Sequence, residues 1–336
     1  MITSCEKIES NIPYEVDVPV LFWLWIRPHL TERVFAQICK EKPSILFIAS
    51  DAGRTDSEKE CVEKCRSLVK NIDWQCTVYR IYNDQANLGL YQMDAYAKKY
   101  VFNRVDRMVV LEDDVLPCDG FFRFCAELLE KYKDDMRVQL ICGMNQLGEY
   151  KAPNSDYFFS NGGSIWGFAI WKRTYLAQYE KELYNNKYYF DMVKKAAKRD
   201  IYRAEHIFDR IKLGDPSIHP EGTETYTVVQ RYSQNQLNIV ATRNMITYLG
   251  FTDDAEHAIG EDLLPPQLQQ LAHLPVFPFY GNMRHNPYVI RDIDYEKAIN
   301  RIMGFGSWWN RLHIKLSYPL YRYIGKIRRL FVRDSH

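Results

Sequence analysis

Three consecutive carboxylates are the feature of this chain best suited to chemistry. Glu112, Asp113 and Asp114 directly follow Met108 to Leu111, an unbroken apolar run typical of a strand buried on both faces of a parallel sheet. Ligands of open α/β sheets bind outside the carboxyl ends of the strands. Acidic turns after strands are common. Crowded carboxylates, however, repel one another and lose hydration, which favours a bound cation or a donor network over a solvated loop.

The pattern of the acids indicates a hard cation. In extended backbone, alternate residues point the same way, so we expect Glu112 and Asp114 to face one ligand. A diphosphate with Mg²⁺ or Mn²⁺ needs only one or two protein carboxylates, because phosphate oxygens and water complete the octahedron.

Polar residues also follow the three preceding predicted strands: Arg27, Asp51, Asn83 and Asp84. A guanidinium at a strand end can bind a phosphate or a ribose with its planar fork, although a plain surface arginine is an equal alternative. Asp51 precedes Gly53 and competes as a turn former. Asn83 and Asp84 could line the same crevice.

The elements around these residues alternate regularly. We expect strands at 18–26, 45–49, 76–81, 107–111 and 138–142. Helices are expected at 29–40, with Thr31 as a possible N-cap, at 89–102 and at 121–132. A further charged helix is expected to follow the turn at 50–54 and to end at Leu68. This alternation predicts a doubly wound parallel α/β sheet. We divide the chain into a leader (1–16), a nucleotide-binding half (17–150), an acceptor half (151–262) and a wrap-around segment with a C-terminal helix (263–336).

Composition excludes some classes of protein. The 336 residues carry 44 basic and 43 acidic side chains, a net charge of +1, which argues against a nucleic-acid binder that acts through bulk charge. Eight cysteines without a C-x-x-C pair indicate reduced thiols in a cytosolic protein. The N-terminus lacks the pattern of a signal peptide, and the longest apolar stretch is too short to span a bilayer.

Five segments resemble glycosyltransferases of the GT-A fold, particularly the family of N-acetylglucosaminyltransferase I and its bacterial relatives with an acidic triplet and a W-G-[WF]-x-x-W signature. They are Phe22 to Pro28, Phe47 to Gly53, Val109 to Phe122, Asn161 to Tyr175 and Asn244 to His257. The resemblance implies a GT-A-type mixed sheet flanked by helices, with a nucleotide-sugar half and an acceptor half.

The resemblance also implies roles for the donor site. Asp114 would bind the metal directly, while Glu112 and Asp113 would hold the ribose and the donor sugar. Asp51 would contact the uracil, and Arg27 would lie at the nucleotide.

The aromatic segment and the later loop receive further roles. Trp166 and Gly167 would lie near the donor sugar, and Trp171 would be buried, although aromatic residues around a glycine more often pack in a core. His257 would lie near the diphosphate, against the more common interpretation of a surface histidine.

An inverting transferase also needs a general base to take the proton from the acceptor hydroxyl. Counting back from Gly250 to the helix start of the related enzymes gives Glu224, with Glu221 as the alternative. Glu224 departs from their usual aspartate, and a solvated glutamate at a helix start is an equal interpretation.

The C-terminal stretch forms a basic amphipathic pattern. Apolar residues recur at helical spacing between Arg311 and Arg333 among seven basic and no acidic side chains, just after Trp308 and Trp309. This pattern predicts that residues 308–333 form either an interfacial helix on an anionic membrane or a helix docked on the enzyme with a basic outer face. In both cases Pro319 would kink the helix.

Together these features predict a cytoplasmic enzyme at the inner face of the membrane. It would be a metal-dependent inverting hexosyltransferase that moves GlcNAc or another hexose from a UDP-sugar to a lipid-linked or polysaccharide acceptor. Two alternatives stay open. A nucleotidyltransferase on a similar sheet would need a glycine-rich phosphate loop, and residues 23–29 contain no glycine. The other alternative is a non-catalytic carbohydrate-binding scaffold.

Overall fold

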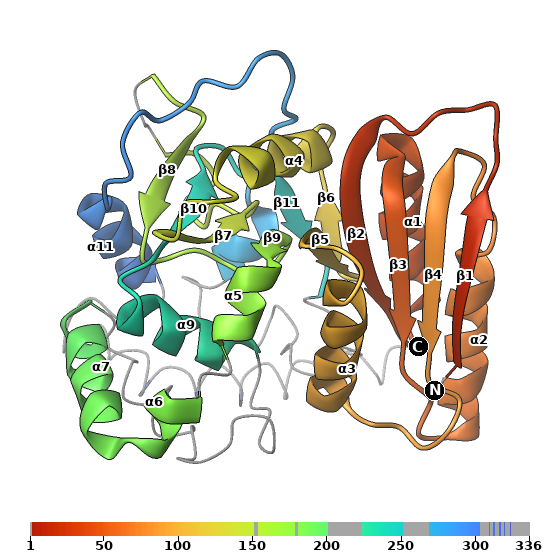
Figure 1. Ribbon diagram of the computed structural model, residues 1–336, viewed down its shortest axis with the longest axis horizontal. Coiled ribbons are helices and arrows are strands. Elements are labelled where there is room, and N and C mark those ends of the chain that lie inside the picture. Colours follow the sequence, from red (N-terminus) through yellow and green to blue (C-terminus); the bar gives the residue numbers. More distant parts are fainter. Residues whose placement is uncertain are drawn as a thin grey trace.

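The computed structural model describes residues 2–150, 154–178, 181–200, 223–250 and 269–302, together with the single residues 309, 312, 316, 319 and 323. Its described part is built on a mixed nine-stranded sheet (Figure 1). In spatial order the strands are β1 (Ile2–Ile8), β4 (Cys76–Tyr82), β3 (Pro43–Ser50), β2 (Val16–Leu24), β5 (Arg107–Glu112), β9 (Phe168–Trp171), β7 (Val138–Cys142), β10 (Leu237–Ala241) and β8 (Tyr157–Ser160).

The strand order reverses between β2 and β5. The chain proceeds outward from β2 to β3 and β4, and then returns to place β5 on the other side of β2. All three pairings are parallel, and Trp23 of β2 lies opposite Glu112 of β5. A crevice at such a switch point, outside the carboxyl ends of the strands, is where open α/β sheets bind ligands.

Helices cover both faces of the sheet. On one face, α1 (Pro28–Glu41), α2 (Asp56–Leu68) and α4 (Phe121–Lys131) pack in a large apolar core. On the other, α3 (Leu90–Phe102), α5 (Lys172–Ala177) and α11 (Ile293–Ile302) close a second core. The predicted doubly wound α/β class is therefore confirmed, with antiparallel strands that the alternation alone did not predict.

Two short strands form a separate sheet beside the acids. β6 (Val115–Pro117) directly follows the acidic triplet and pairs antiparallel with β11 (Ile246–Tyr248). The pairing brings a segment more than a hundred residues away in sequence to the carboxyl end of β5.

Two local expectations are corrected. Helix α1 begins at Pro28, with Arg27 rather than Thr31 at the N-cap, because proline has no N–H to leave unpaired at a first helical position. The expected leader contains β1, whose residues pair antiparallel with β4 along seven positions. Its side chains are largely exposed on both faces, so the hydrophobic pattern did not reveal this edge strand.

Smaller elements complete the acceptor half. Helices α6 (Lys181–Asn185), α7 (Lys187–Asp200) and α9 (Thr223–Ser233) share a small core of their own. A 3₁₀ helix, η2 (Gln270–His273), lies in the predicted wrap-around segment. Residues 284–292 of this segment run along the outer edge of β8.

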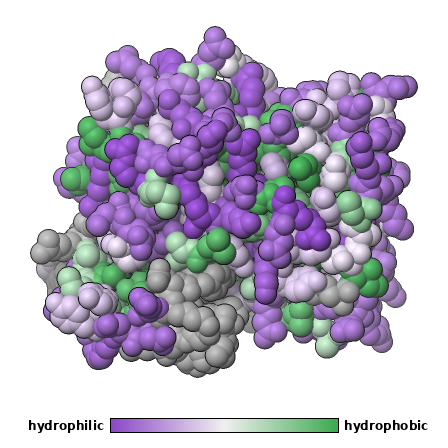
Figure 2. All heavy atoms as spheres, viewed as in Figure 1, coloured by the Kyte–Doolittle hydropathy of each residue, from purple (hydrophilic) through white to green (hydrophobic). Residues whose placement is uncertain are grey.

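The face of the molecule shown in Figure 2 is mostly hydrophilic, with small, separated apolar patches. Among the described residues, none of the helices has the length and apolarity needed to cross a bilayer. All eight cysteines are free. The C-terminal helical extension lies outside the described residues except for five single positions, all helical.

Candidate functional site

The acidic triplet meets Arg27 at the switch point. The Arg27 Nη1 atom donates to Asp114 Oδ2 over 2.9 Å, and its Nη2 atom donates to Asp113 Oδ1. Asp113 and Asp114 are almost fully buried. Burial alone would lower the pKa of Arg27, but the two adjacent carboxylates raise it above its ordinary value. Arg27 thus gives these acids a donor network, one of the two compensations that the sequence led us to expect, while the metal stays a prediction.

Glu112 points away from this ion pair. It is the last residue of β5 and lies on the same sheet face as Val110, toward α3, where Lys98 Nζ is bonded to Asp94 Oδ2 over 2.7 Å. Asp113 and Asp114 lie in the turn that follows, where strand alternation has ended. The expectation that Glu112 and Asp114 face one ligand is therefore corrected, since the acids that share a partner are Asp113 and Asp114.

All three acids are close enough to affect one another. Burial, with repulsion from Asp114 and Asp113, raises the pKa of Glu112 to about 8. Burial also raises the pKa of Asp113 to about 6, against the attraction of Arg27. Near neutral pH Glu112 is therefore largely protonated and can donate a hydrogen bond, as a carboxylate cannot.

One carboxylate oxygen remains unsatisfied. Asp114 Oδ1 is buried without a hydrogen-bond partner, whereas Asp113 accepts from Arg27 and, over 3.4 Å, from the Trp25 backbone N–H. Buried polar atoms are nearly always paired, so this oxygen at the switch point is available to a cation or to a donor group. The described residues contain no group of three or more potential metal-binding side chains. The donor set fits a divalent ion held by one carboxylate, with other ligands from a substrate and water.

An aromatic stack lies beside Asp114. The rings of Trp166 and Tyr248 are parallel within 2°, with centroids 3.9 Å apart. Burial, together with the charges of Asp114 and Glu112, raises the pKa of Tyr248 well above its usual range. A Cβ on Gly250 would lie 2.5 Å from Asp114 Oδ2 and 2.4 Å from the Tyr248 hydroxyl oxygen, so only glycine allows this close approach.

Gly167, just before β9, and Trp171, its last residue, have packing roles. Gly167 adopts a φ of +69°, and a Cβ there would lie 2.4 Å from Ile246 Cδ1. Trp171 is buried and donates from its indole nitrogen to the Leu129 carbonyl, as expected. Gly167 therefore serves the packing of β11.

A second polar network lies at the ends of β3 and β4. The Asp51 carboxylate accepts from the Ala52, Leu88 and Gly89 N–H groups and from the Asn83 amide over 2.7 Å. Asn83 also donates to the Ala86 carbonyl. Every Asp51 oxygen is thus engaged in holding the loop that enters α3, so Asp51 acts here as a turn-forming residue.

Asp84 points to the other side of that loop. It pairs with Arg66, a buried arginine that also donates to the Ser50 hydroxyl and the Asn83 carbonyl. Through Arg66, Asp84 helps to anchor α2.

Trp25 connects the two networks. Its backbone N–H reaches Asp113, its indole nitrogen donates to the Ala52 carbonyl over 3.2 Å, and the Arg54 guanidinium lies 4.5 Å from its ring centroid. Asn87 donates to the same Ala52 carbonyl over 2.6 Å. A half-buried aromatic ring between the acids and the loop is suited to hold a planar group.

Two predicted residues cannot be placed at the site. Glu224 is the second residue of α9, as expected for a helix start, but its side chain lies outside the described atoms. Glu221 and His257 lie outside the described residues.

Sequence reasoning missed Trp25, Tyr248, Gly250 and the Asp94–Lys98 pair. Tyr248 and Gly250 lie within a segment that matches the glycosyltransferases, but their role depends on the pairing of β11 with β6. Trp25 lies inside the first matched segment, and its ring could have been noted beside Arg27. Lys98 carried no signal, because a buried lysine cannot be recognised in an amphipathic helix from its type alone.

Comparisons with known proteins give little more. The sequence matches no family model and no curated protein. Among solved structures, the glycosyltransferase GlyE of Streptococcus pneumoniae TIGR4 aligns with a TM-score of 0.31 and 9% identity, over 67% of this chain and 45% of that one. The chain thus spans less than half of the GlyE chain.

A second solved structure is similar to the same degree. Mannose-1-phosphate geranyltransferase of Thermus thermophilus aligns with a TM-score of 0.31 and 9% identity, over 69% of this chain and 75% of that one.

Proposed function

We propose that the chain is a metal-dependent inverting glycosyltransferase that uses a UDP-sugar, carrying GlcNAc or another hexose. The observation that carries the proposal is the buried Asp114 Oδ1, unpartnered at the switch point between β2 and β5 while Arg27 holds the neighbouring oxygen. The resemblance of the acidic triplet and of the Trp166–Trp171 segment to the glycosyltransferases supports the choice of reaction.

The residues around Asp114 suit a nucleoside diphosphate. The diphosphate would lie against Arg27, whose fork matches phosphate as well as carboxylate. The base and ribose would extend toward Trp25 and the Asp51 loop, and the sugar toward the Trp166–Tyr248 stack. A Mg²⁺ or Mn²⁺ ion held by Asp114 would supply Lewis-acid stabilisation of the leaving diphosphate.

Charge is balanced by the chain's own groups before a ligand binds. Arg27 neutralises part of the Asp113 and Asp114 charge, and Glu112 is largely protonated near neutral pH. An incoming diphosphate would compete for the Arg27 guanidinium and leave Asp114 available to the ion. In the proposal Glu224 takes the proton from the acceptor hydroxyl.

We propose further that the acceptor is a lipid-linked glycan or a polysaccharide, reached at the cytoplasmic face of the membrane through residues 308–333. The exposed Trp309, Leu316 and Tyr323 side chains support this interfacial role.

The first test is titration of the protein with UDP, with and without Mn²⁺. We expect Mn²⁺ to tighten UDP binding at least about tenfold, and Asp114→Asn to abolish that difference because the ion loses its protein carboxylate. Asp134→Asn, an exposed aspartate in a turn, is the matched control. UDP binding by the wild type that ignores Mn²⁺, or an Asn variant that still responds to it, would refute the metal site.

The second test separates binding from proton transfer. A screen of nucleotide sugars for hydrolysis identifies the donor, and Glu224→Gln should then lower kcat about a hundredfold while the donor Kd stays unchanged. A normal kcat in this variant rejects Glu224 as the base. A protein that shows no metal-dependent UDP binding and consumes no sugar donor would be the scaffold alternative.

A further inference from the structure

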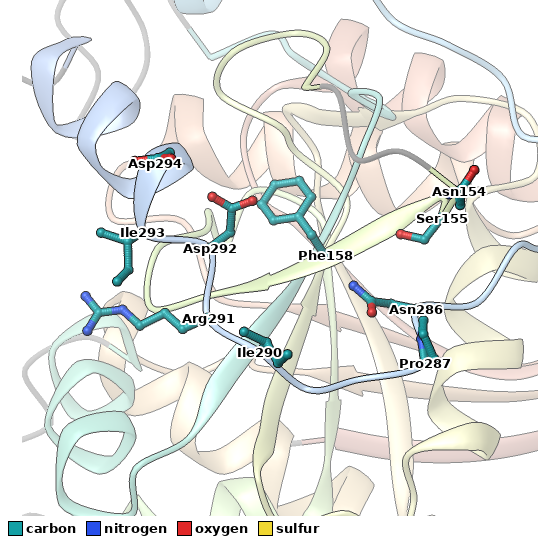
Figure 3. A pocket seen from close by; sticks show the side chains of 10 residues that line it. All are labelled: Asn154, Ser155, Phe158, Asn286, Pro287, Ile290, Arg291, Asp292, Ile293 and Asp294. Carbon is teal, nitrogen blue, oxygen red and sulfur yellow. The ribbon is translucent and has the colours of Figure 1, made fainter.

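A cavity lies at the far edge of the sheet, away from the acids. It has a volume of about 580 Å³ and lies between β8 and the edge segment, which we define as residues 284–292 (Figure 3). Its lining residues are Asn154, Ser155, Phe158, Asn286, Pro287, Ile290, Arg291, Asp292, Ile293 and Asp294. β8 is the fourth strand from β5, so the cavity is about 19 Å from the acids at ordinary strand spacing.

A mismatch in length opens the cavity. The edge segment is bonded to β8 at both ends, through Asp156 N–H to the Arg284 carbonyl and Asp292 N–H to the Phe159 carbonyl. Between these two hydrogen bonds, the edge segment advances eight residues, from Arg284 to Asp292. β8 advances only three residues over the same distance, from Asp156 to Phe159. The extra residues, including Pro287, must bulge outward, so the edge is covered at its ends and hollow between them.

The lining offers hydrogen-bonding groups of both kinds. Asp292 Oδ1 accepts from the Tyr150 hydroxyl and the Tyr295 N–H, each over 2.9 Å, and these two bonds fix the carboxylate. Its Oδ2 has no partner among the described residues. The Asn286 oxygen accepts from Tyr288 N–H, which leaves its amide nitrogen to donate within the described part of the chain.

The charges of the lining exclude an anionic ligand. Arg291 is paired with Glu296, an acid buried behind it, through two contacts of 3.0 Å. Asp294 is paired with Lys297 over 3.1 Å, so Asp292 is the lining acid without an ion-pair partner among the described residues, and its charge would repel a phosphate. This cavity is therefore no second nucleotide site.

Apolar surface accompanies these polar groups. Phe158 forms the floor, and Pro287 and Ile290 lie on the rim, Ile290 with 67% of its surface exposed. A fixed carboxylate and an amide beside apolar side chains match a neutral molecule that has vicinal hydroxyls on its edges and C–H groups on its faces, namely a sugar ring.

We propose that this cavity binds one sugar unit of a glycan chain at a distance from the acids. β8 begins opposite Ala241, at the carboxyl end of β10, which runs parallel to β7 and in the same direction as β5. The start of β8 therefore lies at the same end of the strands as the acids. Its identification as an acceptor subsite rests on the proposed function, whereas sugar binding itself does not.

The probes are maltotriose and N,N′,N″-triacetylchitotriose, titrated at millimolar concentration and followed by saturation-transfer NMR on the full chain. We expect at least one trisaccharide to bind, and Ile290→Trp to weaken its binding at least about tenfold by filling the cavity. Met136→Trp, which adds the same ring to another exposed apolar position, should have no effect. Asn286→Ala, which adds no bulk, should weaken binding by about threefold.

Two results overturn the inference: neither trisaccharide binds the wild type, or Ile290→Trp binds as well as the wild type does. UDP titration of the same samples keeps the two proposals apart. A chain that binds a trisaccharide through this cavity but no UDP retains this inference and loses the proposed function. A chain that binds UDP with Mn²⁺ but no trisaccharide retains the proposed function and loses this inference.

Discussion

Glu112 shows how burial changes the chemistry of a single residue. Desolvation and two neighbouring carboxylates raise its pKa to about 8, while Asp113 and Asp114 share a guanidinium. Three successive carboxyl side chains therefore behave in two ways: Glu112 can donate a proton, whereas Asp113 and Asp114 form ion pairs with Arg27. The sequence predicted the cluster, but the division depends on where β5 ends.

The raised pKa makes stability depend on pH. Between the ordinary value of 4.5 and about 8, the folded chain keeps a proton on Glu112 that the unfolded chain has lost. This contribution is complete below pH 4.5 and disappears as the pH rises through 8. We expect the free energy of unfolding of the wild type to fall on the order of 4 kcal/mol more between about pH 5 and about pH 9 than that of Glu112→Gln.

Urea unfolding at the two pH values measures this difference. Glu60→Gln, an exposed glutamate in α2, is the control and should keep the wild-type dependence on pH. If Glu112→Gln loses as much stability on alkalinisation as the wild type, Glu112 is ionised in the folded protein.

At the scale of elements, the small β6–β11 sheet completes the site. It directs Tyr248 onto Trp166 and places Gly250 against Asp114. Its contact with the main sheet depends on Gly167, whose missing side chain leaves room for Ile246 and Val115. Gly167, Ile246 and Val115 come from distant parts of the sequence, and their contact leaves no room for a methyl group on Gly167.

We expect Gly167→Ala to lower the free energy of unfolding on the order of 3 kcal/mol, through both a left-handed φ and a clash with Ile246. Gly281→Ala is the matched control, because its φ of +84° is equally left-handed but its Cβ would meet nothing within 4 Å. It should cost about 1–2 kcal/mol from backbone strain alone. Equal losses in urea unfolding would show that the packing against β11 contributes nothing.

At the scale of the whole molecule, charge is balanced except near the C-terminus. The net charge of +1 gives no general attraction to an anionic surface, so membrane binding would depend on the seven basic residues between 311 and 333. Trp309, Leu316 and Tyr323 there expose 71%, 66% and 65% of their surface, which suits insertion at the headgroup level.

Deletion of residues 308–336 should therefore release the protein from anionic phosphatidylglycerol vesicles in a sedimentation assay while UDP binding persists. Trp309→Ser should weaken vesicle binding about threefold or more, and Met136→Ser, at an exposed apolar residue elsewhere, should not. Binding that survives the deletion would assign the membrane contact to another surface.

The sequence by itself determined the first four parallel strands and the position of the acids and Arg27 at their ends. Long apolar runs and helical periodicity are local signals that survive without tertiary contacts. It did not reveal β1, because an edge strand exposed on both faces has no apolar alternation to detect. It also could not pair β8, β9 and β10 with strands far away in the sequence.

Only the tertiary structure decided which carboxylates act together. Arg27 could have faced any of the three acids, and the turn after Glu112 directed it to Asp113 and Asp114. It also decided that Asp51 holds a loop and that a hollow opens beside β8. These outcomes depend on register, backbone direction and the unequal lengths of adjacent segments, which residue type and spacing along one chain do not encode.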